Sequence, residues 1–497
     1  MSVSSLPFLH GALAAVLPKL AAWRRDFHAH PEAGWTEFRT AALIIRRLRE
    51  LGYAIRMGEA ACASDRRMGV PSSAVLAAAR ERALEHGADA ELVAGMGDGY
   101  TGFWADLDCG PGPVTAFRFD MDCNEVAECA EESHRPVREG FASRWPGLMH
   151  ACGHDGHAAV GLGLAEVLVS IRRHLRGRIR LIFQPAEEGA RGALPMSEAG
   201  AVDGVDVLFG FHIGFKAEGP GSLICGTQGF LATTKRDVLF SGVPAHAGAA
   251  PEEGKDALLA ACSAVVNLHA ISRNGKGGTR IAVGRLEGGE ARNVIPASAR
   301  LFMETRGETT ELDAYMTAES ERILRASADL WGCACEWRTV GNSAGGGSSP
   351  ELARLIATVA EAMGGWKTVI PMSGFGATED FACLMSRVQA SGGLASYLQV
   401  GTDRAAGHHS DRFDFDETCL GRALELLARL AVRMAGGGQE DTETETESDM
   451  EFLDEVVRRK GIHVQLWLEG EDGEGFGRGR VELLQLVDEL GSLSKAA

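Results

Sequence analysis

Three histidines, a cysteine and an aspartate fall within eight consecutive residues, from His150 to His157. Thiolate sulfur, imidazole nitrogen and carboxylate oxygen are the donors that proteins use to bind transition metals. A second motif, the run 184–189, places the adjacent carboxylates Glu187 and Glu188 just after the apolar segment 179–183. The H-E-x-x-H helix motif of zinc hydrolases is absent from the chain. The sequence therefore predicts a metal site whose ligands come from several strand ends.

Cys152 taken alone fits a buried packing residue, which is the usual role of a free thiol. Its position between His150 and His154 favours a metal ligand instead. His157, three residues beyond His154, is expected only to pack or hydrogen-bond beside the site. Asp155 is expected to orient a ligating histidine.

The composition is typical of a soluble globular protein, with 45% hydrophobic and 24% charged residues. A length of 497 residues predicts two or three domains. The net charge of -18 argues against a nucleic-acid-binding main body. Residues 440–497 carry 16 acidic and 6 basic side chains, a net of -10, so more than half of the excess lies there.

The chain shows no sign of a membrane or export segment. Leu6 to Trp23 has the pattern of an amphipathic helix interrupted by Pro18 and Lys19, and no run of eighteen apolar residues occurs. The eleven cysteines include no C-x-x-C pair, which is typical of free thiols in a reducing compartment. We therefore expect a cytoplasmic protein.

Strands alternate with helices in the first half of the chain and again after residue 350, which predicts an α/β fold with a largely parallel sheet. The carboxyl ends of such strands form ligand sites, and Glu187, Glu188 and His212 follow or end strands. Asp120 and Asp122 are expected to orient ligands there. The predicted helices are 36–51, 155–174, 350–363 and 417–435, and the predicted strands are 114–119, 178–183, 205–213 and 395–401.

The intervening region changes character near residue 230. Strands at 231–241, 279–286, 298–306 and 335–340 and helices at 254–272 and 310–330 give the order β-α-β-β-α-β of a ferredoxin-like fold. The glycine-rich run 341–347 indicates a hinge or linker. We therefore expect a catalytic α/β domain, residues 1–230 and 342–436, interrupted by a ferredoxin-like α+β lid and dimerisation domain, residues 231–341. Residues 437–450 are expected to be a disordered linker.

Seven motifs in the same order resemble those of the di-metal aminoacylase and carboxypeptidase family of zinc- or manganese-dependent amidohydrolases. The motifs are 27–32, 150–157, 184–189, 242–246, 293–296, 379–381 and 408–417. Cysteine in the run 151–154 indicates the branch that cleaves N-acyl and N-aroyl amino acids. The helical insertion at 60–100, with the runs 97–102 and 132–136, is most similar to enzymes of that branch that hydrolyse p-aminobenzoyl-glutamate.

The resemblance implies a complete set of metal ligands. These are Cys152, His154, Glu188, His212 and His409. Cys152 would bridge two divalent ions, Mn²⁺ or alternatively Zn²⁺, and activated water would be the nucleophile. Glu187 is implied as the general base, although two adjacent acids also fit a helix N-terminus. His408 and His409 compete for one ligand role, and the register of the family pattern favours His409.

Three residues of the lid complete the implied site. His246 would stabilise the developing oxyanion, often in the site of the partner protomer, or it is an ordinary loop histidine. Asn293 and Arg306 are implied contacts for the tetrahedral oxygen and the substrate carboxylate. Arg306 fits a solvated strand-end charge equally well. Glu379 and Asp380 either form a solvated acidic pair or shape the cleft.

Together these roles predict a dimeric two-metal amidohydrolase that splits an N-aroyl or N-acyl amino acid, with p-aminobenzoyl-glutamate as the best single substrate. Its products would be p-aminobenzoate and glutamate. The alternatives are a broader N-acyl-amino-acid deacylase, an indole-acetyl-amino-acid hydrolase, and a non-catalytic metal-binding regulator joined to a DNA-binding module. A homologous second subunit is a further possible partner.

The last segment, residues 451–497, resembles the start of the winged helix-turn-helix of molybdate-responsive regulators. The resemblance stops inside the first helix of that motif, and the recognition helix that would enter the major groove is missing. The segment is also acidic, opposite to a DNA-binding face. No functional nucleic-acid binding is therefore expected.

Overall fold

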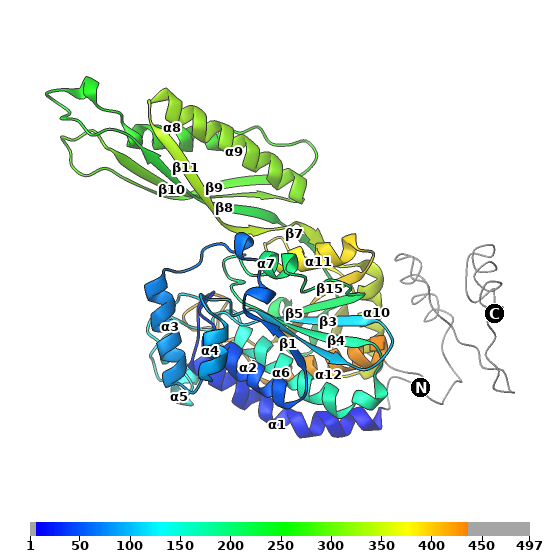
Figure 1. Ribbon diagram of the computed structural model, residues 1–497. Helices are drawn as coiled ribbons and strands as arrows, with labels where there is room; N and C mark the ends of the chain where they lie inside the picture. Colours follow the sequence, from blue (N-terminus) through cyan, green and yellow to red (C-terminus); the bar gives the residue numbers. More distant parts are fainter. Residues whose placement is uncertain (1–5, 436–497) are drawn as a thin grey trace.

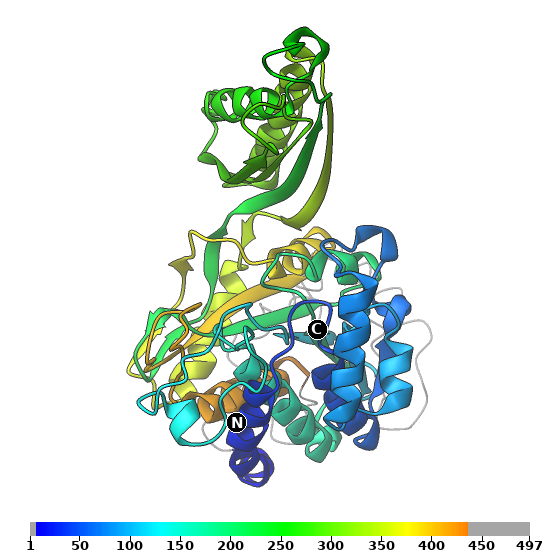
Figure 2. The ribbon, with the colours of Figure 1, turned by 90° about the vertical axis from the view of Figure 1, so that its left-hand side faces the viewer.

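The structure is a computed structural model that describes residues 6–435. A large α/β unit carries a smaller unit that projects from it at one end (Figures 1 and 2). The predicted linker 437–450 and the winged-helix-like segment 451–497 lie outside the described residues. None of the helices between residues 6 and 435 is long and apolar enough to cross a bilayer. All eleven cysteines lie in this range, and each is a free thiol.

An eight-stranded sheet forms the centre of the large unit. From edge to edge its strands are β1 (Ala54–Met57), β2 (Phe103–Asp108), β4 (Arg178–Gln184), β3 (Val114–Asp120), β5 (Val207–Glu218), β15 (Leu394–Thr402), β6 (Ser222–Ile224) and β13 (Thr368–Ile370). The four central strands, β4 to β15, are parallel, whereas β2 and β6 join them antiparallel. The prediction of a largely parallel sheet is therefore right for the centre, and the sheet as a whole is mixed.

Helices cover both faces of this sheet (Figure 1). One face carries α1 (Pro7–Ala29), α2 (Phe38–Glu50), α6 (His154–Ser170), α10 (Pro350–Met363) and α12 (Thr418–Ala435). The other carries α7 (Ala193–Glu198) and α11 (Phe381–Ala390). The predicted insertion forms α3 (Ser73–Glu85) and α4 (Ala90–Gly95), which pack on α2. Helix α6 is buried all round because α1, α12 and β3 enclose it, which explains its continuous apolar sequence.

A buried ion-pair cluster fixes α1 to the elements around it. Arg24 of α1 is fully buried and donates to Asp155, at the start of α6, at 2.8 Å. It also donates to Asp414 at 2.9 Å, in the segment that leads to α12. A buried guanidinium is tolerated only when carboxylates compensate its lost hydration, as they do here.

The small unit is a separate four-stranded antiparallel sheet with two helices, and we call it the lid. Its strands, in spatial order, are β11 (Ala334–Ser343), β8 (Ala232–Ser241), β10 (Ser298–Gly307) and β9 (Thr279–Gly288). Helices α8 (Ala257–His269) and α9 (Thr310–Leu330) cover one face. The chain order β-α-β-β-α-β confirms the ferredoxin-like prediction.

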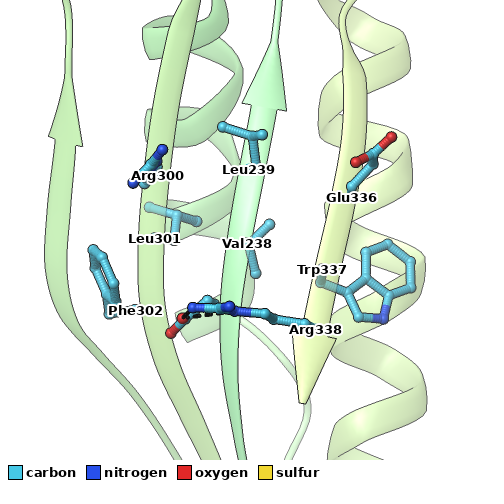
Figure 3. A pocket seen from close by; sticks show the side chains of 9 residues that line it. Val238, Leu239, Arg300, Leu301, Phe302, Glu336, Trp337 and Arg338 are labelled. Carbon is cyan, nitrogen blue, oxygen red and sulfur yellow. Dashed lines mark hydrogen bonds and ion pairs between the residues drawn. The ribbon is translucent and has the colours of Figure 1, made fainter. Parts of the chain in front are cut away.

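The other face of the lid sheet carries Leu239, Arg300, Phe302 and Glu336, and side chains of β8, β10 and β11 line a hollow of about 440 Å³ there (Figure 3). Arg338 reaches across it to Asp237, at 2.8 Å. No group of metal-binding donors among the described residues lies in this hollow.

The glycine-rich run 341–347 is not the free linker that its composition indicates. β11 continues to Ser343, and Asn342 pairs with Thr234 of β8. β12 (Gly346–Gly347) then pairs with β7 (Thr227–Phe230), which also pairs with β14 (Ser373–Gly374), at the junction of the two units. Backbone pairing therefore overrides the flexibility that glycine would otherwise allow.

Candidate metal centre

The metal-binding motifs meet at the carboxyl ends of the central parallel strands. Glu187 and Glu188 follow β4, and Asp122 follows β3. His212 lies in β5, and His154 is the first residue of α6. Because parallel strands end at one edge of their sheet, residues that are distant in the chain converge there.

All five predicted ligands gather around the thiol of Cys152. Ligand atoms of Cys152, Glu188 and His409 lie within 4.8 Å of one another. The sulfur of Cys152 is also 3.5 Å from Nε2 of His212. Nε2 of His154 is 3.9 Å from Oε1 of Glu188. A thiolate at this point would lie close to both nitrogen and oxygen donors.

Two of these atoms, Nε2 of His154 and Oε1 of Glu188, are buried and find no hydrogen-bond partner among residues 6–435. Buried polar atoms are rarely left unsatisfied, so each needs a partner. The other nitrogen of His154 donates to the carbonyl of Asp122 at 2.8 Å, and Nδ1 of His212 donates to that of Ile213 at 2.9 Å. These bonds leave Nε2 of both rings facing the cluster, as metal-bound histidines require. The sulfur, nitrogen and oxygen donors fit divalent transition ions.

His157 has no nitrogen left for a metal, in agreement with the secondary role expected for it. Its Nδ1 donates to Asp120 at 2.6 Å, and its Nε2 accepts the backbone N–H of Ile213 at 3.0 Å. Its ring therefore ties the end of β3 to β5.

The neighbours His408 and His409 also differ in whether a ring nitrogen is available for a metal. Arg404 donates to Nδ1 of His408 at 2.8 Å, and Nε2 of His408 donates to the carbonyl of Ile213 at 3.2 Å. Nε2 of His409 instead lies 3.3 Å from Oε2 of Glu188. The backbone of His409 is left-handed, with a φ of 65°, a conformation that non-glycine residues rarely adopt outside functional or strained sites. The geometry therefore favours His409 over His408 as a ligand.

Carboxylates accept hydrogen bonds from the backbone of the turn that carries the two glutamates. Asp122 accepts the N–H groups of Glu187 and Glu188, each at 3.0 Å. Glu37 accepts the N–H of Ala186 at 2.8 Å, and Ala186 is also left-handed, with a φ of 52°. These bonds direct the two neighbouring carboxylates into the site.

The two carboxylates have opposite pKa shifts. Burial, reinforced by the charges of Glu379 and Glu188, raises the pKa of Glu187 well above its usual value. Burial has the same sense at Glu188, but the hydrogen bond with His409 and the charge of His154 outweigh it and lower the pKa of Glu188 to about 2. The pKa values of these adjacent carboxylates are therefore moved apart, which is the pattern by which acid–base sites divide roles between two carboxyl groups.

Sequence reasoning missed Arg118, which is fully buried on β3 beneath the site. It donates to Asp120 at 2.5 Å and to Glu379 at 2.9 Å, and it contacts Asp380 at 3.3 Å. Glu379 and Asp380 are therefore no solvated pair. Their oxygens lie within 4.8 Å of a Glu187 oxygen, so they border the cluster of donors. An arginine inside a strand that is otherwise buried on both faces was the available signal.

The lid residues do not all come together. His246 is exposed, and its Nδ1 accepts the N–H groups of Gly248 and Ala249, so that Nε2 is the ring nitrogen not used in these bonds. Asn293 lies in the adjoining loop, where its carbonyl accepts the N–H of Ala247 at 3.0 Å. Both loops lie at the end of the lid remote from the large unit, beyond the ten residues of β8, which span roughly 30 Å (Figure 2).

Arg306 lies at the opposite end of the lid. It pairs with Thr233 at the start of β8, close to the large unit. Its side chain is half-buried and donates to Glu304 at 2.8 Å. The structure thus groups His246 with Asn293 and separates both from Arg306.

Comparison with known proteins adds three findings. The sequence profile of Peptidase family M20/M25/M40 matches residues 116–433. The chain is 44% identical over 429 residues to indole-3-acetyl-aspartic acid hydrolase of Enterobacter agglomerans, covering 86% of this chain and 98% of that protein. It is 46% identical over 420 residues to one of the subunits of p-aminobenzoyl-glutamate hydrolase of Escherichia coli (strain K12), covering 84% and 96%. The crystal structure of an aminobenzoyl-glutamate utilization protein from Klebsiella pneumoniae superposes with a TM-score of 0.73 at 39% identity, covering 85% and 98%.

Proposed function

Because the chain belongs to peptidase family M20/M25/M40 and is a metallohydrolase of that family, we propose that it hydrolyses the amide between an aromatic acyl group and an acidic amino acid. The two relatives are named for p-aminobenzoyl-glutamate and indole-3-acetyl-aspartate, which share this chemistry. We place p-aminobenzoyl-glutamate first and indole-3-acetyl-aspartate second. The observation that carries the proposal is the ring of donors around Cys152 beside the protonatable Glu187.

We assign Cys152, His154, Glu188, His212 and His409 as the ligands of two divalent ions, Mn²⁺ first and Zn²⁺ as the alternative. Cys152 would be the shared ligand, since its sulfur is 3.5 Å from Nε2 of His212 and within 4.8 Å of ligand atoms of Glu188 and His409. When bound, the ions supply Lewis-acid polarisation of the scissile carbonyl and lower the pKa of coordinated water.

Glu187 is the group that moves the proton. Its Oε2 lies 3.9 Å from Nε2 of His154, so the carboxylate faces the ligand cluster. It takes a proton from the attacking water and returns it to the departing amino group. The raised pKa of Glu187 suits both transfers, because it brings the carboxylate closer to the range in which a group can both accept and return a proton.

We propose residues 231–341 as a lid and dimerisation domain set into the catalytic unit of residues 1–230 and 342–436. His246 and Asn293 lie far along the lid from their own metal cluster, so they are positioned to serve the site of a second copy of the chain. There His246 and Asn293 would donate to the developing oxyanion.

Arg306, near the base of the lid, stays the proposed contact for the substrate carboxylate. The second copy is the chain itself or, because the relative from Escherichia coli is named as one subunit of its hydrolase, a homologous chain.

A hydrolysis screen on the metal-loaded full chain tests this function. The substrates are p-aminobenzoyl-glutamate, indole-3-acetyl-aspartate, N-acetyl-glutamate and an unmodified dipeptide, each with Mn²⁺ and with Zn²⁺. Release of the free amino acid should be fastest from the two aromatic amides. Cleavage of dipeptides alone, or of none of the four by protein shown to hold metal, would refute the proposal.

A further inference from the structure

Phe215 adopts a backbone conformation that bulky side chains avoid. Its φ is 62°, directly after Gly214 with a φ of 74°. The pairing of β5 with β15 is interrupted at this point, since Ile213 pairs with Val400 and the next pair is Glu218 with Thr402. Left-handed aromatic residues are true outliers, and such strain persists where the surrounding structure enforces it, often at ligand sites.

The strained backbone places the ring of Phe215 against the metal cluster. Its ring centroid is 5.5 Å from that of His212, a proposed ligand, and 5.1 Å from that of His408. Phe215 also stacks on Phe375 with centroids 4.7 Å apart and an angle of 24° between the rings. Phe375 is buried, whereas Phe215 is only half-buried. Phe215 is therefore the outer member of the stack.

The aromatic residues continue towards the catalytic carboxylates. Phe375 lies 6.2 Å from Tyr397, ring centroid to ring centroid. The hydroxyl of Tyr397 donates to Oε2 of Glu379 at 2.7 Å, and Glu379 borders Glu187. One apolar wall thus extends from His212 to the neighbourhood of Glu187, with Phe215 as its partly uncovered end.

We propose that Phe215 is a specificity-determining residue whose ring packs against the aromatic acyl group of the substrate. The inference rests on the proposed function and deepens it, because it names the group that selects an aromatic amide. Aromatic rings stabilise one another in stacked or edge-to-face pairs with centroids about 4.5–7 Å apart. An acetyl group at the same position would leave the exposed face of Phe215 without a partner.

The test compares Phe215→Leu with wild type on p-aminobenzoyl-glutamate and N-acetyl-glutamate. We expect the ratio of kcat/KM for the two substrates to fall by about 3- to 10-fold, the worth of one aromatic contact. Phe215→Tyr, which keeps the ring, should preserve the ratio. Phe8→Leu is the matched control, since Phe8 is also half-buried and stacks on a histidine, His174, at 4.1 Å in another part of the large unit.

Binding supplies a readout that does not depend on turnover. The affinity of the metal-loaded protein for p-aminobenzoate, measured by titration calorimetry, should weaken by a similar factor in Phe215→Leu and not in Phe8→Leu. Equal losses on both substrates, or unchanged p-aminobenzoate binding, would overturn the role of Phe215. Absence of amide hydrolysis by the wild type would instead refute the proposed function, while the binding comparison would still decide the role of Phe215.

Discussion

Asn342 of the lid strand β11 donates its backbone N–H to the carbonyl of Ala190, at 2.8 Å. Ala190 closes the turn that carries Glu187 and Glu188 and is itself left-handed, with a φ of 57°. The side-chain amide of Asn342 holds the other side of the junction by donating to the carbonyl of Thr233 at 3.1 Å. The base of the lid is therefore bonded directly to the turn that carries the two glutamates, and we infer that the position of the lid and that of the two glutamates are coupled.

Gly341→Ala should break this contact, because a Cβ at position 341 would lie 2.3 Å from the carbonyl oxygen of Gly189. The turn or the strand must then move. We expect kcat to fall about 10- to 100-fold, the effect of a misplacement near 1 Å, with a smaller change in KM. Gly284→Ala on β9 is the matched control, since its nearest contact is 4.0 Å away. Steady-state kinetics that place both variants near wild type would contradict the coupling.

Glu187→Gln should abolish turnover and leave the metal content near that of the wild type, because the proton carrier is lost and no proposed ligand is. Each acid–base role contributes roughly 10²- to 10⁴-fold, so a loss of several orders of magnitude is expected. Elemental analysis and an amide-hydrolysis assay on one preparation decide the matter. Glu188→Gln is the informative comparison, since it should lose metal as well as activity.

His409→Ala should lower bound metal, whereas His408→Ala should leave it nearly unchanged. Both nitrogens of His408 are already engaged with Arg404 and Ile213, while Nε2 of His409 faces Glu188. Metal-to-protein ratios of the two purified variants, measured after identical loading, provide the test. Equal ratios would mean that the neighbouring histidines have been assigned to the wrong roles.

Much of the site could be predicted because its chemistry is local in the sequence. The runs 150–157 and 184–189 each concentrate donors in a few residues, and the ends of parallel strands bring them together. Arg118 could not be assigned a partner in this way, since Glu379 lies 261 residues further along the chain. The register of the family pattern favoured His409 over His408, and the supporting backbone φ of His409 and contacts of His408 exist only in the folded chain.

The fold likewise contains elements that could be predicted from local sequence and elements that could not. The apolar content of the long helices and central strands was sufficient to place them, since α6 and strands β3, β4 and β15 are buried almost throughout and are mainly apolar. The edge strands β1 and β13 were not predicted because they have three or four residues and little periodicity. The run 341–347 was predicted to be a hinge or linker, and only the free linker is wrong. Glycine is typical both of flexible linkers and of close backbone contacts, and Gly341 makes a close backbone contact.

Metal affinity should rise with pH. Burial and the charge of Glu188 raise the pKa of the Cys152 thiol well above its usual value, so the metal-free protein holds this proton at neutral pH. A thiolate is the form that binds metal, and binding must therefore release the proton. Below that raised pKa, each pH unit gained should strengthen binding about tenfold for every proton released. Calorimetry in buffers of different ionisation enthalpy measures the number of protons, and Cys152→Ala should release one fewer.

His246→Ala should cut turnover without loss of metal or fold, because His246 is exposed and its Nδ1 bonds stay within its own loop. The position of that loop at the remote end of the lid allows a more specific test (Figure 2). If His246 serves the site of a second copy, inactive His246→Ala and inactive Glu187→Gln chains should complement each other when mixed. A hybrid dimer then contains one site with both residues intact, so each hybrid dimer should reach up to half of the activity of a wild-type dimer, while the parental dimers in the mixture stay inactive. Exchange of chains between dimers must be verified first by native mass spectrometry. Exchange without recovered activity would show that His246 acts within its own chain or has no catalytic role.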